Sequence, residues 1–238
     1  MVETWYEVCD RYGMKMAVLA DIHARKVNEF MTILRKNHPD FIIIPGDFVD
    51  GSRIEKSKIH KEYVQAAINL LNRISQIAPT YVSIGNHEKH FYDAEIEELN
   101  NSNAVILQEQ FVNVRSDLFI GGLSSGKNYY GDSEYCKPNM EFVKCFEQLQ
   151  GFKILLSHHP EYYELYLKNK KIDLMVSGHA HGGQIRLFNR GLYAPDQGLL
   201  PKYTNGIYDG RLIVSRGIAG TEWVPRINNK PEVVFISI

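Results

Sequence analysis

Five groups of side chains suited to bind metal ions follow one another along the first three quarters of the chain. They are Asp21-Ile-His23, Gly46-Asp47-Phe-Val-Asp50, Gly85-Asn86-His87-Glu88, Ser157-His158-His159 and Gly178-His179-Ala-His181. Donors from His, Asp and Asn without a thiolate suit Mn²⁺, Fe²⁺ or Zn²⁺ better than Ca²⁺. These are more ligands than one ion with open positions needs, and a carboxylate such as Asp47 can bridge two ions.

Two divalent ions about 3.5–4 Å apart are the arrangement that proteins use to displace groups at phosphorus. The ions would lower the pKa of a bridging water toward neutrality, supply hydroxide as the nucleophile and neutralise charge on the phosphate oxygens. A leaving alkoxide also needs a proton, and a histidine with an ordinary pKa of about 6.5 can provide it near physiological pH. The residues therefore predict metal-dependent hydrolysis of a phosphate ester.

Each of these polar groups comes directly after a short apolar run rich in β-branched residues. The runs are residues 16–20, 41–44, 81–84, 154–156 and 174–176. In open α/β sheets, ligands bind just beyond the carboxyl ends of the strands, so five such ends can converge on one site. Side chains two apart on an extended segment face the same way, which lets Asp21 and His23, or His179 and His181, reach one ion.

Longer amphipathic stretches separate the apolar runs, which is typical of an α/β protein. We expect helices over residues 26–37, 56–77, 93–101, 140–150 and 160–170. Further strands are expected over residues 5–9, 185–188, 206–208, 212–215 and 233–238, with two or three strands in 104–123. With no linker in the composition, residues 1–238 are predicted to form a single domain.

The charge balance excludes a bulk attraction to polyanions. Lys and Arg total 27 and Asp and Glu total 28, so the net charge is −1 with His neutral. No basic cluster that could form a nucleic-acid patch is seen, which argues against a nuclease of long substrates.

The N-terminal residues and the cysteines bear on the compartment. Glu3 and Glu7 interrupt the region where a signal peptide would have its apolar core, and no uncharged run approaches the ~20 residues of a membrane span. Three cysteines without C-x-x-C spacing predict neither a disulfide framework nor a thiolate zinc site, and we expect them as small buried side chains. A cytoplasmic protein is expected, with peripheral membrane association open and the oligomeric state not predicted.

Taken together and in this order, the five groups resemble the motif set of the calcineurin-like metallophosphoesterase superfamily. The resemblance covers residues 21 to 181, with Glu88 where the family usually has Asp. It implies a four-layer α/β/β/α sandwich with two packed mixed β-sheets and a dinuclear metal site at the C-terminal ends of the strands. Two divalent ions are implied, with Mn²⁺ preferred and Fe, Zn or Ni as alternatives.

The resemblance also implies a role for each site residue. One ion would be held by Asp21, His23, Asp47 and His181, and the other by Asp47, Asn86, His158 and His179. His158 is chosen over His159 because the family's ligand stands two residues before a proline, here Pro160. His87 would stabilise the transition state or protonate the leaving oxygen, oriented by Asp50 or Glu88.

Several residues near these groups are candidates for contacts with substrate. His159 adjoins a ligand, and Arg186, Arg216 and Arg226 could bind a phosphate or another anion. Tyr129 and Tyr130 lie in a loop-like stretch that could line a cleft. Each of these residues has an ordinary structural alternative, such as packing or a surface ion pair.

The C-terminal part resembles a branch of the superfamily that contains bacterial cell-envelope phosphodiesterases. The matching segments are Gly182-Gly-Gln184, Ser215-Arg-Gly217, Pro225-Arg226 and Pro231-Glu232. The branch implies hydrolysis of a phosphodiester or pyrophosphate bond in a small-molecule or lipid-linked substrate. A phosphomonoesterase or protein phosphatase is the alternative. A non-catalytic scaffold is less expected, because a scaffold would have lost some of the metal ligands and this sequence retains all of them.

Overall fold

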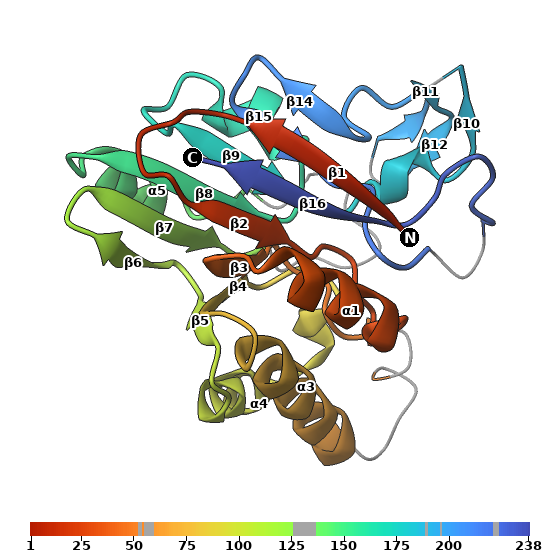
Figure 1. The fold of residues 1–238 in the computed structure, drawn as a ribbon, viewed down its shortest axis with the longest axis horizontal. Coiled ribbons are helices and arrows are strands. Elements are labelled where there is room, and N and C mark those ends of the chain that lie inside the picture. Colours follow the sequence, from red (N-terminus) through yellow and green to blue (C-terminus); the bar gives the residue numbers. More distant parts are fainter. Residues whose placement is uncertain (52–53, 55–59, 126–136, 189, 196, 221–223) are drawn as a thin grey trace.

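Two six-stranded β-sheets pack face to face in the computed structural model, which describes residues 1–51, 54, 60–125, 137–188, 190–195, 197–220 and 224–238 (Figure 1). The first sheet has the order β1 (Val2–Glu7), β16 (Glu232–Ser237), β2 (Lys15–Val18), β3 (Phe41–Ile44), β4 (Thr80–Ser83) and β5 (Val105–Leu107). Strands β2 to β5 are parallel, and β16 runs antiparallel to β2. The sheet is therefore mixed.

The second sheet has the order β14 (Gly206–Tyr208), β15 (Leu212–Val214), β9 (Leu174–Ser177), β8 (Phe152–Ser157), β7 (Leu118–Leu123) and β6 (Gln110–Arg115). Its four inner strands are parallel, whereas β14 and β6 are antiparallel to their neighbours. Five parallel strands, β2, β3 and β4 of the first sheet and β8 and β9 of the second, are followed by the polar groups that the sequence singled out.

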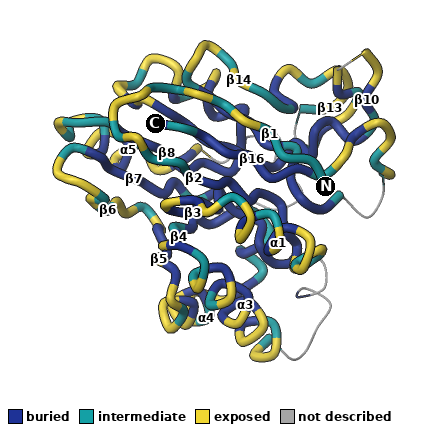
Figure 2. Tube along the Cα trace, in the orientation of Figure 1, coloured by how far each residue is buried: buried dark blue, intermediate teal, exposed yellow. Residues whose placement is uncertain are grey.

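Alternating side chains divide the apolar residues between two faces of each sheet. Met16 and Val18 of β2 point into the cluster between the sheets, while Ala17 packs on the outer face. Such alternation is the period of two that a strand imposes on its side chains. Inner strands such as β3, β7 and β8 are almost wholly buried because both faces are covered, whereas the edge strands β1, β6 and β14 are partly exposed, as Figure 2 shows for β6.

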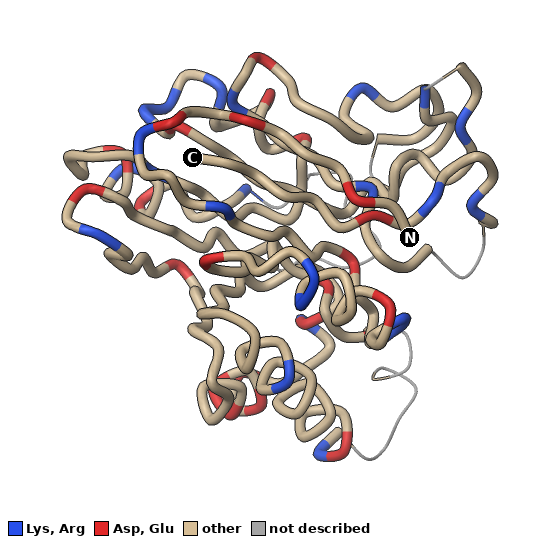
Figure 3. The backbone as a smooth tube through the Cα atoms, in the orientation of Figure 1, with Lys and Arg blue, Asp and Glu red and all other residues tan. Residues whose placement is uncertain are grey.

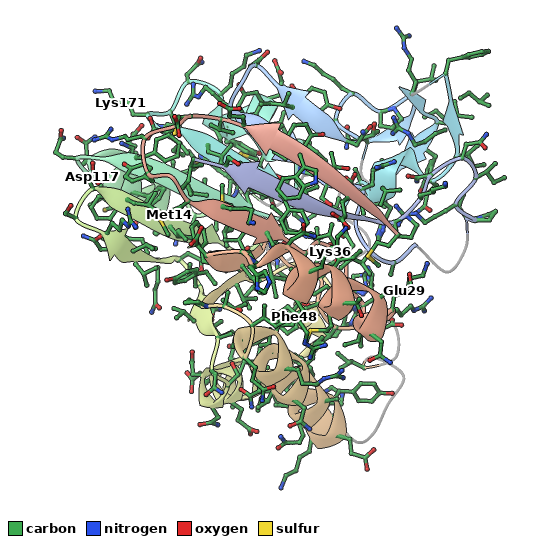
Figure 4. The ribbon with its side chains drawn as sticks, in the orientation of Figure 1. Met14, Glu29, Lys36, Phe48, Asp117 and Lys171 are labelled. Atoms are coloured by element: carbon green, nitrogen blue, oxygen red, sulfur yellow. The ribbon has the colours of Figure 1, made fainter. Side chains whose placement is uncertain are left out.

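Helices cover the outer face of each sheet. On the first sheet these are α1 (Val27–Asn37), α3 (His60–Ser75) and α4 (Asp93–Glu98), whose apolar sides share one cluster with Phe48 (Figure 4). The second sheet is covered by α5 (Met140–Glu147) and the π-helical turn η3 (Tyr163–Leu167). The resulting four layers confirm the predicted α/β/β/α sandwich.

Three details differ from the sequence-based expectations. The helix expected over residues 160–170 is only the five-residue turn η3, where the backbone amide of Lys168 donates to the carbonyl of Tyr163. The strand expected over 185–188 is the two-residue β10 (Arg186–Leu187), because Phe188 has a left-handed φ of 47° that ends the extension. Cys145 is exposed and Cys9 half-buried, contrary to the expected burial, and Cys136 lies outside the described residues.

None of the helices in the described ranges has the length and apolar character that a bilayer span requires.

Candidate metal centre

Six of the seven predicted ligands gather in two neighbouring groups at the ends of the strands. The first half-site comprises Asp21, His23 and His181, and the second comprises Asp47, His158 and His179; within each, the ligand atoms lie within 4.8 Å of one another. All six side chains are buried. A further group of His23, Asp47 and His87 links the two.

Three of the histidines are oriented through the same ring nitrogen. The Nδ1 atom lies 3.1 Å from the carbonyl oxygen of Val49 in His23, 3.0 Å from that of Pro45 in His158, and 3.1 Å from that of Ala219 in His181. A carbonyl only accepts, so Nδ1 must carry the proton and donate. Each Nε2 is therefore turned toward the centre. In His23 and His181 it presents the lone pair of a metal-binding imidazole, and in His158 it does so once a metal ion displaces its proton.

Several donor atoms of the centre are buried without a hydrogen-bond partner among the described residues. They are the Oδ2 atom of Asp21, the Oδ1 atom of Asn86 and the Nε2 atom of His23. Leaving a buried polar atom unsatisfied costs about 1–3 kcal/mol. Carboxylate, amide and imidazole donors of this kind fit a pair of divalent ions, which would satisfy them together.

His87 has the opposite hydrogen-bond pattern. The backbone amide of Gly51 donates to its Nδ1 at 2.8 Å, so this nitrogen accepts and the proton of the neutral ring is on Nε2. That Nε2 lies 3.8 Å from Oδ2 of Asp47, at the edge of the centre. His87 therefore presents a hydrogen-bond donor where the other three rings present lone pairs.

Burial and charge set the ionisation of the cluster. Burial lowers the pKa of His23 and of His181 to about 3, which keeps both rings neutral. Burial also lowers the pKa of His158, but the negative charges of Asp47 and Asp21 outweigh it and raise the value to about 9. The His158 ring lies 3.0 Å from Oδ2 of Asp47, so in the protein alone the two form an ion pair.

The backbone of the centre is strained at the ligands themselves. Asp21, His23, Asp47, His179 and His181 all have positive φ angles, from 45° to 67°. Non-glycine residues rarely adopt this left-handed conformation, which persists only when surrounding contacts enforce it. Such outliers cluster at functional sites, and here they coincide with five of the predicted ligands.

Glycines allow the chain to approach two of the carboxylates closely. A Cβ atom at Gly85 would lie 2.2 Å from Oδ1 of Asp47, and one at Gly217 would lie 2.5 Å from Oδ2 of Asp21. Side chains at these positions would displace the carboxylates. Gly85 belongs to a predicted motif, whereas the contact of Gly217 joins the C-terminal part of the chain to the centre.

Glu88 braces two of the metal-site loops. Its buried carboxylate accepts hydrogen bonds from the backbone amides of Asp47 (2.8 Å), Val49 (3.1 Å) and Gly85 (2.8 Å). Burial and the charge of Asp47 nevertheless raise its pKa to about 7. From the sequence, Asp50 or Glu88 is expected to orient His87. The Nδ1 atom of His87 accepts instead from the backbone amide of Gly51.

Asp50 lies beside that amide and is buried. Its Oδ2 atom is 3.2 Å from the Nη2 atom of the Arg25 guanidinium, so it pairs with a cation on the loop after β2. Asp50 is therefore placed to hold the loop that carries Gly51.

The C-terminal tail supports the first half-site through Arg226 and Asn229. The guanidinium of Arg226 donates to the carbonyls of Arg216, Gly217 and Ala219, and the last of these accepts from His181. The amide of Asn229 donates to the carbonyl of His181 at 2.7 Å. The sequence does not predict this supporting role of Arg226 and Asn229, because their partners are backbone carbonyls, which every residue has.

The expected anion-binding arginines are mostly engaged elsewhere. Arg216 forms a buried ion pair with Glu232, with Nη2 and Oε2 2.6 Å apart, and Arg226 holds the tail. The guanidinium of Arg186 donates to the carbonyl of Gly182 at 2.8 Å and lies near the hydroxyl of Thr204. Arg186 thus lies beside the metal-site loop and supports it.

His159 lies next to the second half-site. Its ring centre is 4.2 Å from that of His179, and its Nδ1 is 2.9 Å from Oε1 of Glu161. Burial lowers the pKa of His159 to about 4, so the ring is neutral. Tyr129 and Tyr130, the candidates for lining a cleft, lie outside the described residues.

Comparisons with known proteins agree with this geometry. The family model for calcineurin-like phosphoesterase matches residues 14–183. The uncharacterized metallophosphoesterase Cj0846 of Campylobacter jejuni is 31% identical over 94% of this chain, which spans 59% of that relative. The phosphodiesterase YaeI of Escherichia coli is 24% identical over 94% of this chain and 82% of its own length.

A solved structure shares the fold. The dimetal phosphatase from Danio rerio superimposes with a TM-score of 0.50 at 11% sequence identity, over 86% of this chain and 88% of that one. The match of the family model over most of the chain, with the motifs in place at the ends of the strands, identifies the family. The chain belongs to the calcineurin-like phosphoesterase family.

Proposed function

We propose that the chain is a metal-dependent phosphoesterase that hydrolyses phosphodiester or pyrophosphate bonds. The observation that carries the proposal is the contrast among the buried histidines. His23, His158 and His181 turn lone pairs toward the centre, while His87 turns a donor toward it. A site that combines electron-pair donors with one proton donor suits displacement at phosphorus.

Two divalent ions fit the donors. Asp21, His23, Asp47 and His181 would hold one, and Asp47, Asn86, His158 and His179 the other. When bound, such ions supply an activated water and neutralise charge on the phosphate oxygens. The donor types suit Mn²⁺, Fe²⁺ or Zn²⁺, and the family resemblance favours Mn²⁺, with Fe, Zn or Ni as alternatives.

The remaining residues orient groups and stabilise charge. His87 donates a hydrogen bond from Nε2 to the leaving oxygen and stabilises the negative charge that develops there, and the Gly51 amide keeps that tautomer. Asp50 acts as a positioning residue through the loop that carries Gly51. His159 and Arg186 flank the centre, where a substrate would contact the protein.

A diester or pyrophosphate is favoured over a monoester by the tail motifs, which are shared with a branch of phosphodiesterases. The relative YaeI bears the name phosphodiesterase, in agreement with that branch. A phosphomonoesterase is the second candidate, because the metal centre alone does not choose the leaving group. A non-catalytic scaffold is disfavoured by the complete donor set.

Hydrolysis of bis-p-nitrophenyl phosphate beside p-nitrophenyl phosphate tests the proposal, after dialysis against chelator and readdition of Mn²⁺. We expect metal-dependent cleavage of the diester, with Asp47→Asn inactive as the control for contamination. Preference for the monoester would make the protein a phosphatase instead. The scaffold would be supported if neither ester is cleaved by protein that holds two metal ions, as shown by elemental analysis.

A further inference from the structure

Two small ladders stand apart from the sheets just after the metal-site loop. We call residues 185–203 the outer segment. Strand β10 pairs antiparallel with β11 (Arg190–Gly191), and β12 (Tyr193–Ala194) with β13 (Gly198–Leu199), and neither pair joins a large sheet. In Figure 1 the labelled strands β10, β11 and β12 lie at one corner of the molecule.

The outer segment exposes apolar side chains to an unusual degree. Phe188 is 100% exposed, Leu199 82% and Leu200 74%, and these are the most exposed large apolar side chains among the described residues. Tyr193 is exposed too, opposite Leu199 in the ladder. Apolar residues grouped at the surface mark sites of interaction with a protein or a membrane.

The outer segment is also basic. It contains Arg186, Arg190 and Lys202 but only one acidic residue, Asp196, a net charge of +2, whereas the whole chain carries −1. Arg190 is exposed and faces Leu187 across the first ladder. Figure 3 shows Lys and Arg positions along this corner of the molecule.

The outer segment is firmly attached to the metal centre. The amide of Leu192 donates to the carbonyl of Gly183 at 3.2 Å, and the Arg186 guanidinium binds the carbonyl of Gly182. A Cβ atom at Gly183 would lie 2.3 Å from the Cα of Gly191, so the two backbones touch. Gly182 and Gly183 belong to η4 (His181–Gly183), which also carries the predicted ligand His181.

We propose that the outer segment docks on an anionic lipid bilayer, with Phe188, Leu199 and Leu200 inserted at the interface. Apolar tips beside basic residues bind such a surface through buried apolar area and attraction to anionic lipids together. A second copy of the chain is a poorer occupant, because a two-fold contact would oppose the same basic surfaces. Docking would bring the loop of His181 close to the bilayer surface.

Vesicle binding tests docking without any turnover, so its outcome is separate from that of the proposed function. Wild-type protein is sedimented with vesicles of phosphatidylcholine alone, or with about a third phosphatidylglycerol, at about 0.1 M salt. We expect binding to the anionic vesicles only, weakened at higher salt. Leu199→Ser/Leu200→Ser should lower the partition coefficient at least about tenfold, and Phe188→Ser should act in the same direction.

The matched control is Val105→Ser/Leu165→Ser, which removes two exposed apolar side chains outside the outer segment. It should bind vesicles like the wild type, and all variants should keep the wild-type melting temperature. The proposal is overturned if the wild type stays in the supernatant, if the control loses as much binding as the Leu199 and Leu200 variant, or if that variant still binds fully. Light scattering that shows a dimer broken by that variant, without vesicle binding, would assign the surface to a second copy.

Discussion

The two half-sites of the metal centre are supported by different parts of the chain. In the first, the amide of Ala219 donates to the carbonyl of Asp21 and its carbonyl accepts from His181, so a tail loop holds two ligands. In the second, His158 directly follows strand β8, its ring donates to the carbonyl of Pro45, and its own carbonyl accepts from the amide of Gly178.

Because their supports differ, the two ions that the centre would hold need not be lost together. The supports named for His158 come from strand ends inside the sandwich, whereas the first half-site also needs residues that follow η4 by 30 or more positions in sequence. Damage to the tail should therefore weaken one ion selectively. Four substitutions, in order of decreasing effect, examine that separation.

The largest effect is expected where the half-sites share a ligand. Asp47→Asn removes the bridging charge, and we expect both ions to be weakened and kcat to fall about 10³-fold or more, since several kcal/mol of transition-state stabilisation are lost. Metal content by elemental analysis and kcat on the diester are the measurements. Retention of two ions would show that Asp47 does not bridge the half-sites.

His87→Ala should leave both half-sites intact. The ring faces the centre with a donor, so we expect two bound ions and a fall in kcat of about 10²–10⁴-fold, the usual worth of a positioned acid. His60→Ala is the control, because that histidine stacks on Tyr92 away from the centre. If His87→Ala loses metal, the ring is a ligand and the assignment is wrong.

Arg226→Gln separates the half-sites most directly. We expect the ion of the first half-site to bind about 10–100-fold more weakly, as is usual when a group behind a ligand is lost, and activity to return at high metal concentration. Metal titration should then resolve one tight and one weak ion.

The control for Arg226 is Arg211→Gln. The guanidinium of Arg211 also donates to backbone carbonyls, those of Lys168, Lys170 and Ile172. It directly precedes β15, whereas the metal centre lies at the carboxyl ends of the parallel strands. It should lower the melting temperature and leave both ions in place. Equal loss of metal in both variants would mean that general destabilisation, rather than the tail, empties the first half-site.

The smallest effect is expected at His159. Loss of one neutral contact with substrate costs about 1 kcal/mol, so His159→Ala should raise KM about five- to tenfold with a smaller change in kcat. Steady-state kinetics on the diester measure both constants. A lower metal content with unchanged KM would instead show that His159 supports His179.

Much of the centre could be predicted because its donors follow apolar strands directly. The alternation in segments such as Met16 to Val18 fixes which residues enter the core, and the polar residue that follows must emerge at the carboxyl edge. The structure brings Asp21, Asp47 and His158 together as expected. Their roles as ligands remain predictions for the measurements above.

The rest escaped prediction for physical reasons. The groups that orient His23, His158 and His181 are backbone carbonyls, which every residue has. The sequence predicts a single strand, residues 185–188, in the outer segment. Leucines such as Leu199 and Leu200 are usually buried, but among the described residues none covers these two side chains. Residue types indicate which side chains can be buried, whereas the topology decides which of them are buried.

The carboxylate of Glu88 has a consequence for how the protein acquires its ions. Because three backbone amides of the loops after β3 and β4 converge on one side chain, protein contacts keep these loops in place before any ion arrives. Loading can then be a late step that follows folding, and one ion can exchange for another without unfolding the chain. The metal found in purified protein would accordingly follow the supply in the host cell and the growth medium.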